Sequence, residues 1–377
     1  MPQQKPEIKS EDKPAQRFQC PGCAADMEFD PEIGKMRCRF CGQTADVPAQ
    51  PAGPAPPHSL DEFLAKTDDS HLRPLTEQAL EVSCSGCGSR IAFQPPEVAG
   101  ACPFCGADIV AQPKAADPLI APDGLLPAKV PKNKAQSEVR AWLQSRWFAP
   151  NALKRLARQE AIAGVYLPFW DYAADTRSQY RGERGVHYYE TETYEESDGR
   201  GGRELKTRQV QRTSWTPAAG EVSHRFDNVL VAATHSVAEH RLDALEPWDL
   251  EALYAYEPAY LAGFKAQRYQ VELPAGYDRA KSVMQSAIEQ DVEKDIGGDE
   301  QRIDRIETEY SNTTFRHLLL PVWIGAYRFQ SKIYQVVVNA RTGEVQGERP
   351  YSAWKIAALV GAILLILAII FVLRSSS

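Results

Sequence analysis

The sequence lacks the short motifs of several large enzyme classes. It contains no G-x4-G-K-[ST] phosphate-binding loop, no H-E-x-x-H motif, no G-x-S-x-G nucleophile elbow and no dinucleotide-binding fingerprint. These absences exclude a P-loop motor of the ATPase or helicase type and leave no recognisable catalytic constellation. We therefore assign no catalytic residue and predict that the chain is not an enzyme.

Cysteine is absent outside two short segments, which begin at Phe18 and Val82 and repeat one pattern. All eight cysteines fall in these segments, each of which holds two C-x2-C pairs separated by fourteen residues. This spacing is typical of a four-thiolate zinc site, because each tight turn directs two sulfur atoms at one point. The predicted ligands are Cys20, Cys23, Cys38 and Cys41 for one zinc ion and Cys84, Cys87, Cys102 and Cys105 for a second.

Disulfide bonds are the alternative use of these cysteines, and they require an oxidising compartment. The N-terminal stretch MPQQKPEIKSEDKPAQ has no apolar segment of the kind that a signal peptide contains, so we expect reduced thiols and bound zinc. Each segment is too short to bury a core of its own, so the metal should supply its folding free energy. Glycine follows three of the four pairs (Gly42, Gly88 and Gly106) and Ala24 follows the first, which fits a turn with positive φ.

An excess of positive charge is also absent, and this weighs against nucleic-acid binding. The chain has a net charge of −7. The first cysteine segment has four basic and five acidic residues between Arg17 and Asp46, and the second has one basic and three acidic residues between Glu81 and Asp108. A phosphate-binding surface needs basic residues to displace counterions. A small basic cluster, formed by Lys35, Arg37 and Arg39, keeps a nucleic-acid role open as the alternative.

Long apolar runs are absent except near the C-terminus. The segment Ile356 to Leu373 contains eighteen residues without a charge, which is about 27 Å of helix and close to the thickness of the bilayer core. Trp354 and Lys355 precede it and Arg374 follows it, as interfacial anchors do. We predict a transmembrane tail anchor that leaves the bulk of the chain on the cytoplasmic side of a bacterial inner membrane. The alternative is a buried core helix.

The middle of the chain predicts an α+β domain with a weak internal duplication. An apolar spacing typical of a helix precedes Leu167-Pro168-Phe169-Trp170, and a second one precedes Leu320-Pro321-Val322-Trp323. Each L-P-x-W should open a strand that is followed by a second strand. The helical positions are Val139, Trp142, Leu143 and Trp147 in the first unit and Ala280, Val283, Met284, Ala287, Ile288 and Val292 in the second.

Three further segments predict strands and turns. IYQVVVNARTGEV, with a turn between Asn339 and Gly343, is typical of a hairpin. TSWTPAAGEVSHRFDNVLVAATH indicates strands around a glycine turn, and the acidic run from Tyr188 indicates a solvated hairpin or a flexible insertion. The L-P-x-W segments admit two interpretations, an aromatic groove for a partner peptide or ordinary core, and core is the one we favour. His235 and His240 receive no metal-binding role.

We predict an α+β chain of separate units joined by proline-rich linkers, so that the zinc ribbons are not part of one packed core. The predicted units are a disordered N-terminus (1–16), zinc ribbon 1 (17–48), a spacer with a possible short helix (49–80), zinc ribbon 2 (81–112), a proline-rich linker (113–134), the central α+β domain (135–352) and the transmembrane helix (354–374).

Several segments together resemble a bacterial family, the TFIIB-type zinc-ribbon-containing membrane proteins. The resemblance rests on the two ribbons and on GVYLPFWDY, YLAGFKAQRYQVEL, LLLPVWIGAYRF and VVVNARTGEVQGERPYS, and it extends from about Phe18 to the anchor. Some members are labelled primosomal-protein or helicase-like, a label that finds no motor motif here. The resemblance implies a membrane adaptor for stomatin-like, virion-core-like or phage-shock-type proteins, and it implies no catalytic residues.

The function predicted from the sequence is therefore a tail-anchored, zinc-binding adaptor that recruits protein partners, and the resemblance implies a role in a membrane-stress response. Two ribbons on one chain would allow two weak contacts with a repeated partner, which raises avidity through effective concentration. The sequence predicts no small-molecule substrate. The alternative function is a membrane-tethered nucleic-acid-binding protein related to transcription or replication.

Overall fold

The structure is a computed structural model, and it describes residues 18–47, 53–65, 72–73, 80–93, 99–110, 119–147, 150, 162–197, 203–329, 332–348 and 350–375. The predicted disordered N-terminus (1–16), the first residues of the spacer (49–52), the first part of the predicted linker (113–118) and the end of the acidic run (198–202) lie outside the described residues.

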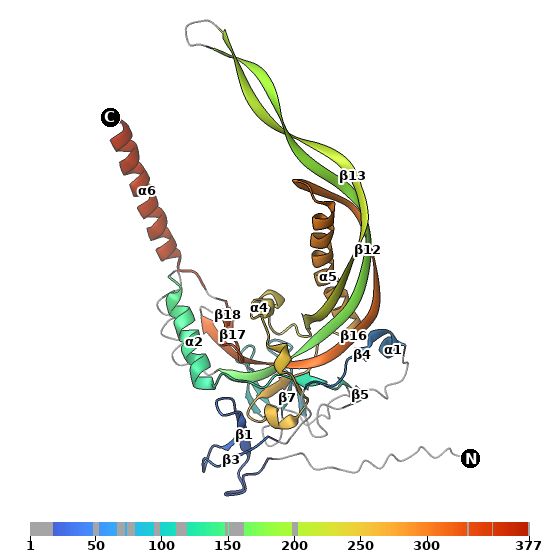
Figure 1. Cartoon of the computed structure of the whole chain (residues 1–377). Coiled ribbons are helices and arrows are strands. Elements are labelled where there is room, and N and C mark those ends of the chain that lie inside the picture. Colours follow the sequence, from blue (N-terminus) through green and yellow to red (C-terminus); the bar gives the residue numbers. More distant parts are fainter. Residues whose placement is uncertain are drawn as a thin grey trace, which may run out of the picture.

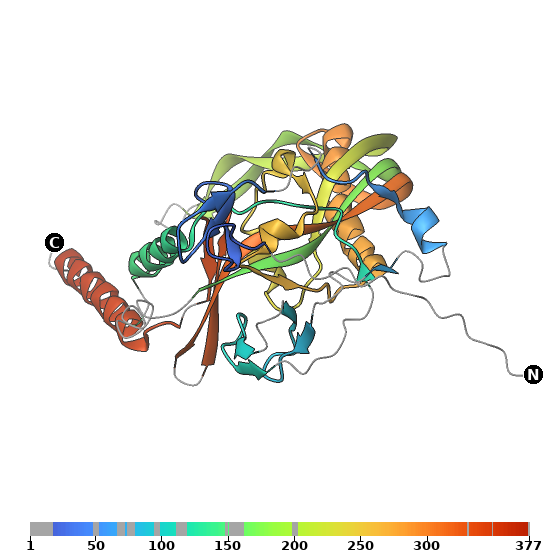
Figure 2. The ribbon, with the colours of Figure 1, turned by 90° about the horizontal axis from the view of Figure 1, so that it is seen from below.

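The fold is α+β, as predicted, with two small cysteine-bearing units beside a strongly curved central sheet (Figures 1 and 2). The first unit contains β1 (Met27–Asp30), β2 (Lys35–Cys38) and β3 (Thr44–Ala45), and the second contains β6 (Leu80–Ser83), β7 (Arg90–Phe93), β8 (Ala99–Ala101) and β9 (Asp108–Val110). Between them lie β4 (His58–Ser59), α1 (Leu60–Leu64) and β5 (Leu72–Arg73). Helix α1 is the short helix expected in the spacer.

The central domain is built mainly from three long strands and two helices. In chain order its elements are β10 (Leu119–Ile120), β11 (Gly124–Leu125), α2 (Lys132–Ser145), β12 (Ala163–Ser197), β13 (Arg203–Ala232), α4 (Glu239–Asp243), η2 (Leu250–Ala252), β14 (Tyr254–Ala255), η3 (Pro258–Leu261), β15 (Lys265–Gln267), α5 (Leu273–Ile296), β16 (Glu300–Phe329), β17 (Lys332–Asn339) and β18 (Val345–Gly347). Helix α5 lies along the inner side of the curved strands (Figure 1).

The internal duplication is real and relates β11–α2–β12–β13 to β15–α5–β16–β17. The two L-P-x-W segments lie side by side in antiparallel strands, with Leu167 opposite Leu320. Each long strand also pairs in parallel with the short strand of the other unit, β12 with β15 and β16 with β11. The equivalent strands of the two units therefore pair with each other about Leu167 and Leu320, which is the pattern expected of a local two-fold axis.

Hydrogen bonds around the two motifs repeat in the same way. The indole N–H of Trp170 donates to the carbonyl of Val271, two residues before α5, at 2.8 Å, and that of Trp323 donates to the carbonyl of Val130, two residues before α2, at 2.8 Å. Each tryptophan thus fixes the entry to the helix of the other unit. Both side chains are buried, at 0% and 6% exposure, so the core interpretation of L-P-x-W is confirmed.

Several local predictions need correction. L-P-x-W does not open its strand, because β12 begins four residues before the first motif and β16 twenty residues before the second. No turn forms at Gly220, where β13 runs on as one strand paired with β12. On the helices, Val283 is 56% exposed, and Trp147 lies beyond the end of α2 at 75% exposure. The hairpin of β17 and β18 is as predicted.

The prediction that the ribbons are separate units, outside the core of the central domain, is wrong for the described residues. The apolar side chains of ribbon 1, which include Met27 and Phe29, belong to one core cluster with Tyr166 and Trp323 of the central domain. Strand β7 of ribbon 2 pairs with β15 of the central sheet. Both contacts remove apolar surface and free strand edges from water, which a flexible tether would leave exposed.

The proline-rich segments are likewise parts of the central domain in their described residues. Strand β4 pairs with β16, and the amide of Ala55 donates to the carbonyl of Asp123 at 3.0 Å. The predicted linker 113–134 supplies β10, β11 and the start of α2, and its Leu125 and Leu126 are fully buried. In the described part of these segments, Pro57 and Pro122 precede short strands and Pro131 is the N-cap of α2, so these prolines are not part of an extended spacer.

Two features project from the body. Beyond the pairing of β12 with β16, which ends at Gly185, β12 and β13 continue as a twisted two-stranded arm (Figure 1). The described part of the acidic run lies on this arm and is mostly exposed, which favours the solvated-hairpin interpretation over a flexible insertion. Helix α6 (Ala353–Ser375) also stands clear of the body, and its segment Trp354–Phe371 has a mean hydropathy of 2.6 with no residue buried. The exposed apolar surface of α6 argues against a core helix.

Candidate metal centres

Each C-x2-C pair forms the same tight turn. The amide of the residue that follows the second cysteine donates to the carbonyl of the first cysteine at 2.7–2.9 Å in all four turns. That residue has a positive φ in every case, 76° at Gly42, 73° at Gly88, 72° at Gly106 and 60° at Ala24. The glycine pattern in the sequence therefore indicated the turn correctly, and Ala24 adopts the conformation despite its Cβ.

The turns bring the predicted ligands together in two groups of four. In each group all four Sγ atoms lie within 4.8 Å of one another. The nearest pairs are Cys20 and Cys41 at 3.4 Å in the first group and Cys84 and Cys105 at 3.5 Å in the second. A tetrahedral site with zinc–sulfur bonds of about 2.3 Å places its sulfurs about 3.8 Å apart, whereas a disulfide needs about 2.05 Å. The geometry fits a bound metal ion, and all eight thiols are free.

The backbone around one sulfur favours the thiolate that a metal requires. Backbone N–H groups of Cys41 and Phe40 lower the pKa of Cys38 to about 6. In ribbon 2, burial raises the pKa of Cys105 to about 11. A bound cation stabilises the thiolates of such a group and offsets the repulsion among four negative sulfurs. Four soft sulfur donors suit zinc or iron, and four protein ligands leave no coordination position open for a substrate.

The two ribbons dock through different faces. Ribbon 1 packs through the strands, where the rings of Phe29 and Tyr260 meet edge to face at 5.1 Å and the amide of Phe29 donates to the carbonyl of Ala262 at 3.0 Å. Ribbon 2 packs through β7, which pairs with β15, and also through its second turn, where the carbonyl of Phe104 accepts from the Gln335 side chain at 2.7 Å. As a result, different surfaces of the two ribbons remain open to solvent.

Phe40 and Phe104 show this difference most clearly, since both occupy the third position of a C-x-F-C turn. Phe104 is fully buried against the central domain, whereas Phe40 is 74% exposed. The guanidinium of Arg39 lies 5.7 Å from the centre of the Phe40 ring. Phe40 is not among the functional residues predicted from the sequence. The repeated phenylalanine was visible in the sequence, but only the docking reveals that one copy is free to contact a partner.

The basic cluster of ribbon 1 is neutralised by neighbouring carboxylates. Lys35 pairs with Asp46 at 2.8 Å, Arg37 with Asp30 at 2.7 Å and Arg39 with Glu28 at 3.0 Å. These cations therefore have acidic partners within the ribbon, which weakens the case for a phosphate-binding surface. The structure does not bring His235 or His240 into either metal-ligating group found among the described residues.

Together the fold and the sites define an α+β protein with two four-cysteine centres, each of which could hold a metal ion, and one apolar C-terminal helix that is a candidate membrane span. The chain is similar to an uncharacterized Bacillus subtilis (strain 168) protein, YdjG, with 26% identity over 345 residues that cover 90% of this chain and 92% of that protein. No family model matches the chain. No solved structure matches it either.

Proposed function

We propose that this chain is a non-enzymatic adaptor of the bacterial inner membrane. It binds one zinc ion in each ribbon, is held by α6 as a tail anchor and presents the ribbons on the cytoplasmic face to protein partners. The proposal assigns it to the TFIIB-type zinc-ribbon-containing membrane proteins that it resembles. The partners proposed through this resemblance are stomatin-like, virion-core-like or phage-shock-type proteins in a membrane-stress response.

The observation that carries the adaptor proposal is the exposed Phe40 on a rigid support. The turn that carries it is fixed by the cysteine group, and the strands of ribbon 1 are built into the central core. An aromatic side chain on a preorganised surface loses little conformational freedom on binding, and such residues dominate many protein interfaces. Ribbon 1 therefore offers a ready contact site for a protein.

Membrane attachment is proposed from α6. Its exposed side chains include Leu364, Leu365 and Phe371, at 60%, 64% and 74% exposure. Truncation before Trp354 should move the protein to the soluble fraction, measured by fractionation and immunoblotting. The control restores an unrelated apolar helix of the same length after Ser352 and should return the protein to the membrane. Membrane association of the truncated chain would contradict attachment through α6.

Partner recruitment is best tested at Phe40, because replacing the cysteines would disturb cores that the ribbons share with the central domain. We expect Phe40→Ala to lower the yield of cross-linked membrane proteins at least ~tenfold, as loss of an interfacial hot spot does. The measurement is affinity purification from membranes of the native host after nuclease treatment, read by mass spectrometry. Ile33→Ala changes a half-exposed side chain at the far end of the same ribbon and is the matched control.

Both variants should retain two zinc ions per chain by elemental analysis. A lower recovery of partners then cannot be ascribed to unfolding of a ribbon. Equal recovery of partners with Phe40→Ala and Ile33→Ala would refute Phe40 as the contact. Recovery of proteins that depends on the ribbons but is lost after nuclease treatment would overturn the adaptor proposal in favour of nucleic-acid binding. Iron in place of zinc would contradict the metal assignment alone.

A further inference from the structure

The arm formed by β12 and β13 lacks support along most of its length. Within the described residues, β12 has no partner other than β13 beyond Gly185, and the outer edge of β13 pairs with no strand between Arg203 and Ala232. An isolated two-stranded hairpin is marginally stable in water. Its free N–H and C=O groups are also a template for a further strand.

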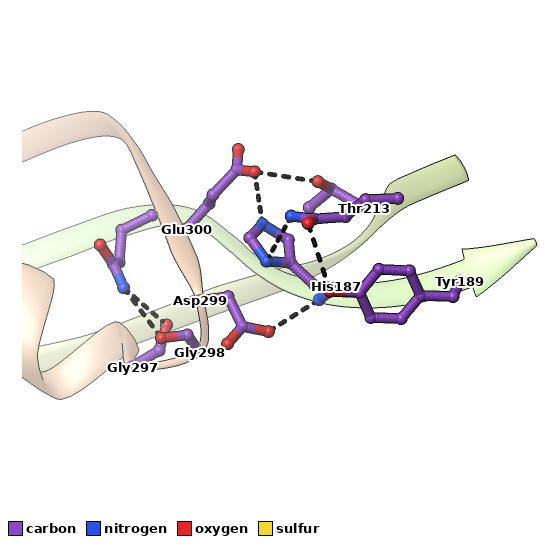
Figure 3. A network of polar contacts seen from close by, with 9 residues as sticks. His187, Tyr189, Thr213, Gly297, Gly298, Asp299 and Glu300 are labelled. Atoms are coloured by element: carbon purple, nitrogen blue, oxygen red, sulfur yellow. Dashed lines mark hydrogen bonds and ion pairs between the residues drawn. The ribbon is translucent and has the colours of Figure 1, made fainter. Parts of the chain in front are cut away.

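The base of the arm is fixed by the turn between α5 and β16 (Figure 3). The amide of His187 donates to the Asp299 carboxylate at 2.7 Å, and the amide of Asp299 donates to the carbonyl of Gly185 at 2.8 Å. The His187 ring lies between Glu300, with Nε2 at 2.7 Å from Oε1, and Gln211, with Nδ1 at 2.7 Å from Nε2. These contacts attach the arm to the central domain in a defined orientation.

The two strands of the arm carry opposite charges. The β12 side, residues 186–197, contains four glutamates and no lysine or arginine, whereas the β13 side, residues 203–217, contains four basic residues and one acidic residue. Their register places Glu192 opposite Arg208, so most of these charges share one face. The ion pairs on that face join Glu190 and Arg212, Glu192 and Arg208, Glu192 and Arg212, and Glu196 and Lys206, at 2.5–3.0 Å. One edge of the arm is therefore acidic and the other basic.

We propose that the arms of successive copies of this chain pair edge to edge, with the basic edge of β13 against the acidic edge of β12 in the next copy. A two-fold axis would place β13 beside β13 or β12 beside β12. Either arrangement sets like charges opposite each other, which destabilises a sheet. Only the head-to-tail order continues the alternation of acidic and basic strands, and it keeps neighbouring strands antiparallel.

Head-to-tail contacts of this kind build rings when the rotation closes and filaments when it does not. The pairing edge on β13 extends from Arg203 to Thr216, since Pro217 has no N–H to donate. Each added copy supplies a third strand to its neighbour, which is what an unsupported hairpin requires for stability. The assembly would also arrange the metal centres of many chains as an array. This inference does not depend on membrane attachment or on the partner of Phe40.

The test uses full-length protein in detergent and two arm variants. The half-swapped variant, Arg208→Glu with Arg212→Glu, makes both edges acidic and should be monomeric by native mass spectrometry. The full swap adds Glu190→Arg and Glu192→Arg, which restores the ion pairs within the arm with their signs exchanged. The full swap should assemble with itself but not with the wild type, because the exchanged positions of each mixed edge then set like charges against each other.

The decisive measurement is co-purification of differently tagged chains. We expect the yield of full swap with wild type to be at least ~tenfold below that of wild type with wild type or swap with swap. Equal co-purification of the mixed pair would refute edge pairing and locate any self-association elsewhere, for example in α6. A wild type that is monomeric at every concentration up to its solubility limit would overturn the proposal outright.

Discussion

His317 is buried in the central core, and its surroundings disfavour the charged form of the ring. Its Nδ1 lies 2.9 Å from the carbonyl of Ile120, and no partner for its Nε2 is present among the described residues. Burial lowers the pKa of His317, against the opposing effect of the nearby Asp123 carboxylate. The folded protein therefore holds this ring neutral at a pH at which the unfolded chain binds a proton.

This predicts a loss of stability in acid. Because the folded-state pKa of His317 lies below its unfolded value of about 6.5, its contribution is fully present above that pH and decreases as the pH falls further, by up to about 1.4 kcal/mol per unit. His317→Gln keeps an N–H for the Ile120 carbonyl and should flatten the dependence between pH 5 and 7. The measurement is the free energy of unfolding in urea at each pH.

The control for this prediction is His235→Gln, which changes an exposed histidine and should leave the pH dependence of the wild type unchanged. Loss of the aromatic ring lowers the stability of His317→Gln at every pH, so the slope is the informative quantity. Identical slopes in the two variants would show that another group, and not His317, causes the acid sensitivity.

At the scale of elements, the duplicated tryptophans predict matched effects from two distant substitutions. Trp170→Phe and Trp323→Phe each remove one indole N–H and leave a buried carbonyl at the entry to a helix, at Val271 or Val130. Each should lower the free energy of unfolding by about 1–3 kcal/mol, the usual cost of an unsatisfied buried group. Thermal and urea unfolding of the two variants measure this, with Trp354→Phe on the exposed part of α6 as the control. A substantial effect of only one substitution would contradict the functional equivalence of the two units.

The same elements define what could be predicted from the sequence. The C-x2-C spacing and the following glycines were enough to predict both cysteine groups, because the ligands of one turn are set by local geometry. L-P-x-W was enough to reveal the duplication. The exchange of hydrogen bonds between the units was not predictable, since Trp170 and Val271 are 101 residues apart and only the strand register brings them together.

The strands also explain the errors at this scale. Glycine and proline favour turns or strand ends, yet Gly220 and Pro168 of the first L-P-x-W segment both lie inside continuous strands. Gly220 is required there for space, because a Cβ would come within 2.7 Å of the Tyr180 hydroxyl and 2.9 Å of the Asp295 carboxylate. A glycine in a strand interior can therefore mark a close approach of side chains from a neighbouring strand and helix as well as a turn.

At the scale of the whole molecule, the sequence predicted a string of units and the structure combines them. The proline-rich spacers suggested independence, and short segments with few apolar residues gave no sign of docking. In the structure each ribbon contributes to a core shared with the central domain, Cys20 and Cys38 to one cluster and Cys84 and Cys102 to another. A metal ion at either site should therefore stabilise more of the protein than the ribbon that binds it.

This coupling predicts that loss of metal from ribbon 2 will destabilise the neighbouring strand of the central sheet. Strand β7 covers one edge of β15, with Ile91 opposite Gln267, whereas ribbon 1 contacts the chain before β15, at Ala262. Cys87→Ser removes an exposed cysteine from the candidate metal centre of ribbon 2 and should speed amide exchange in β15 (Lys265–Gln267) at least ~tenfold, measured by hydrogen–deuterium exchange mass spectrometry. Cys23→Ser removes an exposed cysteine of ribbon 1 and is the matched comparison. Ribbon 1 shares a core cluster with Ala266, but among the described residues it pairs with no strand of the central sheet, so exchange in β15 should rise far less than in Cys87→Ser. Unaltered protection of β15 in Cys87→Ser would mean that ribbon 2 folds and unfolds independently of the central domain, as separate units joined by linkers would.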